Sequence, residues 1–113
     1  MRTLSILVAA AVAGLLASGQ SAAPLPALLP APVIVELFTS EGCSSCPPAD
    51  VVLQRLEAGM PGVEVIALGE HVTYWDRLGW KDRFSADAFT QRQEGYSRKF
   101  RLGSVYTPQM VVN

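Results

Sequence analysis

The chain has 113 residues, of which half are hydrophobic, and its nine basic and ten acidic side chains give a net charge of −1. This length is sufficient for one domain. The nearly balanced charge gives no reason to expect a nucleic acid or an anionic membrane surface as a partner, since both attract strongly basic proteins.

Residues 1–23 have the pattern of a secretory signal peptide. Arg2 supplies a positive charge, an apolar stretch follows at 4–17, and small residues suited to cleavage come after it. An uncleaved membrane anchor is the alternative, but a spanning helix needs about 20 apolar residues. We therefore expect an exported bacterial protein, periplasmic or secreted, that is free of the membrane after cleavage.

Residues 24–32 are rich in proline and alanine. The prolines of this stretch are Pro24, Pro26, Pro30 and Pro32. Proline at this density excludes a helix or a sheet strand, because each ring removes a backbone donor. We expect an extended leader here, followed by one domain at 33–113.

Residues 33–39 form the first predicted strand. The run is apolar and β-branched, as in a central parallel strand that is covered on both faces. Glu36 interrupts it, and a carboxylate at such a place must be paired, solvated or protonated. Glu36 is expected either to face a polar edge or to serve as a buried proton acceptor for a cysteine.

Cys43 and Cys46, the only cysteines, lie between this strand and a helical pattern at 49–58. A Cys-X-X-Cys at a strand-to-helix junction is typical of a redox dithiol. Cys43 is expected at or just before the helix N-terminus, where free N–H groups and the helix dipole favour a thiolate. Cys46, one turn further, is expected to be the more buried resolving thiol.

Other uses of the cysteine pair are less well supported. A purely structural disulfide across so short a loop constrains the unfolded chain little. Zinc usually needs four ligands, and the chain has two cysteines and one histidine. A c-type haem is excluded because Pro47 stands where its motif needs histidine. We expect no metal or cofactor, although two thiols could bind Cu(I), which prefers soft ligands.

The helix that follows begins with two prolines, which suit its first turn. Its apolar stripe is expected to be Ala49, Val52, Leu53 and Leu56. A second strand is predicted at 63–68, parallel to the first as in a βαβ unit. His71 follows it, at the sheet edge that Cys43 also occupies. His71 is expected either to favour the Cys43 thiolate when protonated or only to order the aromatic loop at 69–82.

The last third of the chain predicts a helix and a strand. Ser85 is expected to cap a helix at 86–101, whose basic last turn complements the helix dipole and which Gly103 ends. A third strand is predicted after Pro108. The chain stops where a hairpin turn and a partner strand would follow, so we expect it to be a piece of a longer protein.

This order of elements, with Cys-X-X-Cys after the first strand and Thr-Pro before the third, resembles the thioredoxin superfamily. Over residues 33–113 the chain is most similar to an exported bacterial family called domain of unknown function 1223. The motifs are VELFTS at 35–40, GCSSCPPAD at 42–50, HV at 71–72, YWDRLGWKD at 74–82 and VYTPQMVVN at 105–113. The resemblance implies a thioredoxin-like α/β fold, here its β-α-β-α-β portion, with the closing hairpin strand and last helix missing.

The resemblance also implies roles for residues. In the superfamily the proline that opens the third strand is usually cis and lies against the dithiol, so Pro108 and the backbone of Thr107 are expected to hold substrate. We expect an exported thiol-disulfide oxidoreductase in which Cys43 attacks and Cys46 resolves, with Glu36 and His71 handling protons. Its partner would be a thiol or disulfide of a protein or small molecule. The alternatives are a periplasmic Cu(I)-binding or delivery protein and a module whose disulfide is only structural.

Overall fold

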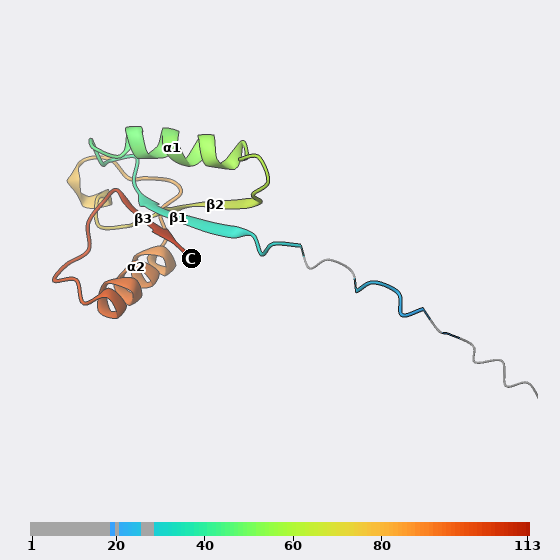
Figure 1. Ribbon diagram of the computed structural model, residues 1–113. Helices are drawn as coiled ribbons and strands as arrows, with labels where there is room; N and C mark the ends of the chain where they lie inside the picture. Colours follow the sequence, from blue (N-terminus) through green and yellow to red (C-terminus); the bar gives the residue numbers. More distant parts are fainter. Residues whose placement is uncertain (1–18, 20, 26–28) are drawn as a thin grey trace, which may run out of the picture.

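A computed structural model describes residues 19, 21–25 and 29–113 of the chain. Its elements, in chain order, are β1 (Val33–Thr39), α1 (Pro47–Glu57), β2 (Val65–His71), the short 3-10 helix η1 (Asp76–Leu78), α2 (Asp87–Phe100) and β3 (Gln109–Val112). They form a mixed α/β domain with a three-stranded sheet and two helices (Figure 1). The predicted signal peptide lies largely outside the described residues, and the described part of the leader carries no helix or strand.

The sheet has the order β2-β1-β3, so β1 is central as predicted. β1 and β2 are parallel, with a register that runs from Val33 opposite Val65 to Thr39 opposite His71. β3 is antiparallel to β1. Because β1 and β2 run in the same direction, the segments that leave Thr39 and His71 start at the same edge of the sheet.

The two helices lie on opposite faces of the sheet (Figure 1). The buried apolar residues gather around β1 and the turn after it: Val35, Leu37, Phe38, Cys43, Cys46 and Val72. The prediction of one buried stripe on α1 is wrong in part, because no residue of α1 is buried and Val52 is 44% exposed. The two cysteines are therefore a substantial part of a small core.

Several element boundaries differ from the sequence-based prediction. β2 begins at Val65 and runs on to His71, because its ladder with β1 continues for the full length of both strands. Val63 instead forms an isolated bridge with Met60. At the start of α2, Ser85 does not cap the helix, because its hydroxyl donates to Asp76 Oδ2 at 2.6 Å.

The segment between α2 and β3 has two unusual backbone conformations, one at Arg101 and one at the Thr107–Pro108 bond. α2 ends at Phe100, one residue before the predicted end, and its C-cap is Arg101, whose backbone is left-handed (φ 57°), rather than Gly103, which was predicted to stop the helix. The Thr107–Pro108 peptide bond is cis, as the family resemblance implied. Among the described residues, no helix has the length and hydropathy needed to cross a membrane.

Candidate functional site

Cys43 and Cys46 are joined by a disulfide whose Cα atoms lie 5.4 Å apart. Cys46 is the N-cap residue of α1, and its carbonyl accepts the N–H groups of Ala49 and Asp50. Cys43 lies a turn earlier, where its carbonyl accepts the Cys46 N–H at 3.2 Å. Cys43 was predicted at or just before the helix N-terminus, and it lies before it by about one turn, because Cys46 is the N-cap. The helix dipole, which acts within the first turn, therefore favours a thiolate on Cys46 more than one on Cys43.

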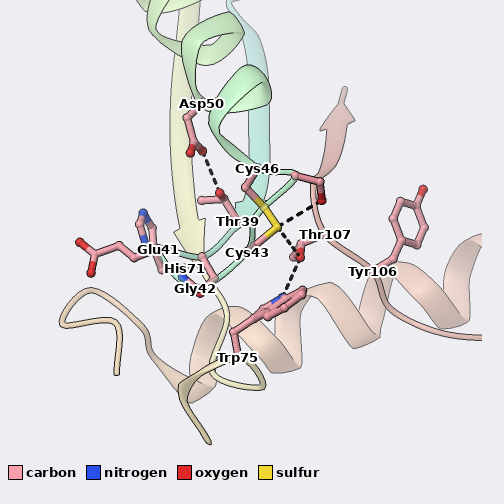
Figure 2. Close-up of a disulfide and its surroundings, with 12 residues drawn as sticks. Thr39, Glu41, Gly42, Cys43, Cys46, Asp50, His71, Trp75, Tyr106 and Thr107 are labelled. Atoms are coloured by element: carbon pink, nitrogen blue, oxygen red, sulfur yellow. Dashed lines mark hydrogen bonds between the residues drawn. A yellow bond between two sulfur atoms is a disulfide. The ribbon is translucent and has the colours of Figure 1, made fainter. Parts of the chain in front are cut away.

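The loop before β3 lies directly against the disulfide (Figure 2). The Thr107 hydroxyl donates a hydrogen bond to Cys43 Sγ at 3.3 Å. The indole N–H of Trp75 donates in turn to Thr107 Oγ1 at 2.8 Å. Ser45 Oγ is a second polar neighbour of Cys43 Sγ, at 3.6 Å. The structure thus brings Cys43, Cys46 and Thr107 together, and Pro108 follows Thr107 in the same loop.

Short-range contacts fix the turn that carries Cys43. Thr39 Oγ1 donates to Asp50 Oδ1 at 2.8 Å, which joins the end of β1 to α1. The Cys43 N–H donates to the Ser40 carbonyl at 3.1 Å. A Cβ on Gly42 would lie 3.4 Å from Trp75 Cβ, so Trp75 packs closely against the backbone just before Cys43.

Asp82, which was not among the predicted site residues, joins this turn to the aromatic loop. Its Oδ2 accepts the Glu41 N–H at 2.9 Å and contacts His71 Nδ1 at 2.5 Å, and its Oδ1 accepts the Phe84 N–H at 2.8 Å. Burial would raise the pKa of Asp82, but the hydrogen bonds from Glu41, His71 and Phe84 outweigh burial and hold that pKa below its ordinary value.

His71 therefore has a defined partner that is not the cysteine pair. Its ring bonds to Asp82 and packs edge-on against Phe84, with ring centroids 5.5 Å apart. Figure 2 shows the ring beside Glu41, turned away from the sulfurs. Of the two expectations for His71, this geometry fits the ordering of the aromatic loop more directly than an action on Cys43.

Glu36 is buried, with 3% of its surface exposed, but its partners lie on α2. Arg92 Nε donates to Glu36 Oε1 at 2.5 Å, and the Tyr96 hydroxyl donates to Glu36 Oε2. Glu70 lies in the same cluster, 3.4 Å from Arg92, and its Oε2 is buried without a hydrogen-bond partner. Burial, with the nearby Glu36 carboxylate, raises the pKa of Glu70 to about 7. Glu36 is thus paired, and none of these bonds reaches the disulfide.

The disulfide itself is well covered, since Cys43 is 2% exposed and Cys46 is fully buried. In the described part of the chain, no group of three or more His, Cys, Asp or Glu side chains is placed to hold a metal ion. Two thiolates released by reduction are the ligands that this site could offer to Cu(I).

The sequence of residues 34–113 matches a family described as a protein of unknown function, DUF1223. The chain belongs to this family. Among curated proteins, none matches the chain. The DUF1223 match covers the strands, the Cys-X-X-Cys turn and the cis-proline loop, so the whole arrangement described above lies within the family region.

One solved structure is similar to this DUF1223 chain. It is an X-ray crystal structure of a protein from Agrobacterium tumefaciens, with 44% sequence identity and a TM-score of 0.62. The match covers 71% of this chain but 35% of the other. The present chain therefore spans about a third of the length of that neighbour.

Sequence reasoning missed Trp75, Asp82 and the Thr107 hydroxyl. Asp82 and Trp75 lie in the aromatic motif, and a short-range signal for Asp82 exists, because an aspartate often accepts the N–H two residues on. No local pattern predicts that Trp75 reaches Thr107, since the two residues are 32 positions apart.

Proposed function

We propose that this DUF1223 chain is the dithiol-bearing part of an exported thiol-disulfide oxidoreductase of thioredoxin-like fold. The observation that carries the proposal is the contact between the Cys43–Cys46 disulfide and the hydroxyl of Thr107, the residue before Pro108. The parallel β1-α1-β2 unit and the antiparallel β3 are compatible with such a fold. Export rests on the sequence pattern of residues 1–23, and an oxidising compartment suits a cysteine pair.

The chemistry follows from the position of the two sulfurs. A substrate thiolate attacks Cys43 Sγ, the Cys43–Cys46 bond breaks, and Cys46 leaves as a thiolate that takes up a proton. A second substrate thiolate then attacks the substrate sulfur of the mixed disulfide and releases Cys43. The substrate dithiol becomes a disulfide, and the protein pair gains two electrons and two protons. The reverse sequence reduces a substrate disulfide.

The folded structure restricts the access of a substrate sulfur to Cys43. With 2% of the residue exposed, a substrate sulfur reaches Cys43 Sγ only after a covering side chain moves. Thr107, whose hydroxyl contacts that sulfur, is such a side chain. Substrate backbone binding beside Thr107 and Pro108, as the superfamily resemblance suggests, would occur at the same place.

The same burial favours a second candidate function, a structural disulfide in a binding module. The two cysteines are among the few buried apolar residues, so the bond also holds the turn after β1 to the start of α1. A structural bond and a redox bond differ in one measurable way. Only the redox pair exchanges with substrate thiols while the domain stays folded.

The test uses two variants of the full chain and a matched control. Cys46→Ser leaves Cys43 without a resolving thiol and should accumulate mixed disulfides, which are visible on non-reducing gels and released by reductant. Cys43→Ser should accumulate none, and Ser44→Ala, at an exposed position between the cysteines, should behave as wild type. Equal trapping by both cysteine variants, or by neither, would refute the assignment of Cys43 as the attacking thiol.

A further inference from the structure

The start of α1, which follows the cysteine turn, has fewer backbone N–H donors than most helices. Cys46, rather than Cys43, is the N-cap of α1, and the first two helical residues are Pro47 and Pro48. Proline has no backbone N–H, so two of the donors that a helix start normally offers are missing. A thiolate on Cys43 therefore needs stabilisation from another source.

The Thr107 hydroxyl is such a source, and its orientation is constrained. A hydroxyl has one proton to donate and lone pairs to accept with. The indole N–H of Trp75 can only donate, and it occupies a lone pair of Thr107 Oγ1 at 2.8 Å. This contact leaves the hydroxyl proton free for Cys43 Sγ, which lies 3.3 Å away.

Both members of this pair are fixed to α2 through one side chain. Gln93 is fully buried, and its amide group donates to the Tyr106 carbonyl at 2.7 Å, next to Thr107. Its carbonyl oxygen accepts the Tyr74 hydroxyl at 2.9 Å, next to Trp75. Gln93 therefore bonds to the residue before Trp75 and to the residue before Thr107, and so anchors both segments.

We propose that Trp75 is a positioning residue that directs the Thr107 hydroxyl at Cys43 Sγ, and that Thr107 thereby stabilises the Cys43 thiolate formed on reduction. A thiolate accepts a hydrogen bond far more strongly than a disulfide sulfur does. The Trp75–Thr107 pair thus favours the reduced form and makes the disulfide more oxidising. This inference rests on the redox function proposed above and adds that the Trp75–Thr107 pair raises the reduction potential of the cysteine pair.

The test measures the equilibrium of the full chain with glutathione, together with a pH titration of thiolate absorbance. Thr107→Val should shift the equilibrium about tenfold toward the disulfide, since hydrogen bonds to charged groups are strong. This shift corresponds to about 30 mV. Trp75→Phe should shift it the same way by about fivefold. Both variants should raise the pH at which the Cys43 thiolate forms. Thr107→Ser keeps the hydroxyl and should give the same values as wild type.

Two controls separate this role from a structural one. Trp80→Phe removes another indole, which donates to Glu41 Oε2 and has no bond to Thr107, and should leave the equilibrium unchanged. Ser45→Ala removes the other hydroxyl near Cys43 Sγ and should have a smaller effect than Thr107→Val. If the Val variant does not fold, Trp75→Phe and Thr107→Ser carry the test.

An unchanged equilibrium in Trp75→Phe would overturn the positioning role, and so would an equal shift in Trp80→Phe. These outcomes are distinct from a failure of the proposed function. Glutathione equilibration reports on the cysteine pair even where Cys46→Ser traps no partner. Absent trapping would refute the oxidoreductase, whereas a missing Trp75 effect in an exchanging protein would refute only this inference.

Discussion

Thr39 Oγ1 donates a hydrogen bond to Asp50 Oδ1 across 2.8 Å, and this bond joins the last residue of β1 to the first turn of α1 on either side of the disulfide. Thr39 is 2% exposed, so in the folded protein its hydroxyl depends on Asp50 rather than on water for a hydrogen-bond acceptor. The two cysteines lie on the turn that this bond closes.

Asp50→Ala should therefore lower the free energy of unfolding by about 1 to 3 kcal/mol, the cost of a buried donor without a partner. Asp50→Asn keeps an acceptor and should cost less. Urea unfolding of both variants measures the difference. A destabilisation of Asp50→Asn as large as that of Asp50→Ala would show that the charge, rather than the bond to Thr39, is what matters.

Gly42 permits a test of the packing in front of Cys43. Its ideal Cβ position lies 3.4 Å from Trp75 Cβ and 3.6 Å from Ser40 Oγ, which are ordinary contacts. Gly42→Ala should thus change the free energy of unfolding by less than about 1 kcal/mol, whereas the longer side chain of Gly42→Leu extends past this Cβ position and is expected to displace Trp75. We expect Gly42→Leu to shift the glutathione equilibrium as Trp75→Phe does. A neutral Gly42→Leu would contradict the close packing of Trp75 on this turn.

Glu70 predicts a pH dependence of stability. Its pKa rises from the ordinary 4.5 to about 7 through burial and the Glu36 carboxylate, opposed by Arg92. The folded protein then binds this proton more tightly than the unfolded chain does, so the free energy of unfolding falls as pH rises from about 4.5 to about 7. Glu70→Gln removes this titration and should be more stable than wild type at pH 8, by about 1 to 3 kcal/mol.

The measurement is urea unfolding of wild type and Glu70→Gln at pH 5 and pH 8. The two proteins should differ little at pH 5, where Glu70 is protonated in the folded state, and should diverge at pH 8. Arg92→Met is the complementary variant, because it leaves Glu36 and Glu70 without the cation between them. It should steepen the loss of stability with pH. Parallel profiles of wild type and Glu70→Gln would refute the raised pKa.

Much of the fold and part of the site were predictable from the sequence. The apolar run of β1, the helix after the cysteines and the parallel β2 are local patterns of spacing, and the structure confirms them. The cis Thr107–Pro108 bond followed from the family resemblance. The partners of charged side chains did not follow, because they depend on contacts between distant segments. Glu36, for example, pairs with Tyr96, 60 positions away.

Gln93 illustrates the same limit. A glutamine in the middle of a helix is usually exposed, but Gln93 is fully buried. Its amide group forms hydrogen bonds with Tyr74, Tyr106 and Gln109. Gln93→Leu keeps much of the volume but leaves three polar partners unpaired, so it should cost about 2 to 4 kcal/mol. Gln91→Leu, at an exposed position of α2, is the matched control. Equal stability of the two variants would show that the Gln93 network contributes nothing.

The reduction potential of the Cys43–Cys46 pair distinguishes a redox dithiol from a structural disulfide. The full chain is equilibrated with glutathione buffers, its thiols are trapped, and the oxidised fraction is measured. A working oxidoreductase should give a value between about −120 and −270 mV, with exchange in the folded protein. A value well below about −300 mV would indicate a structural disulfide and refute the proposed oxidoreductase. So would a pair that is oxidised only after bound copper has been removed.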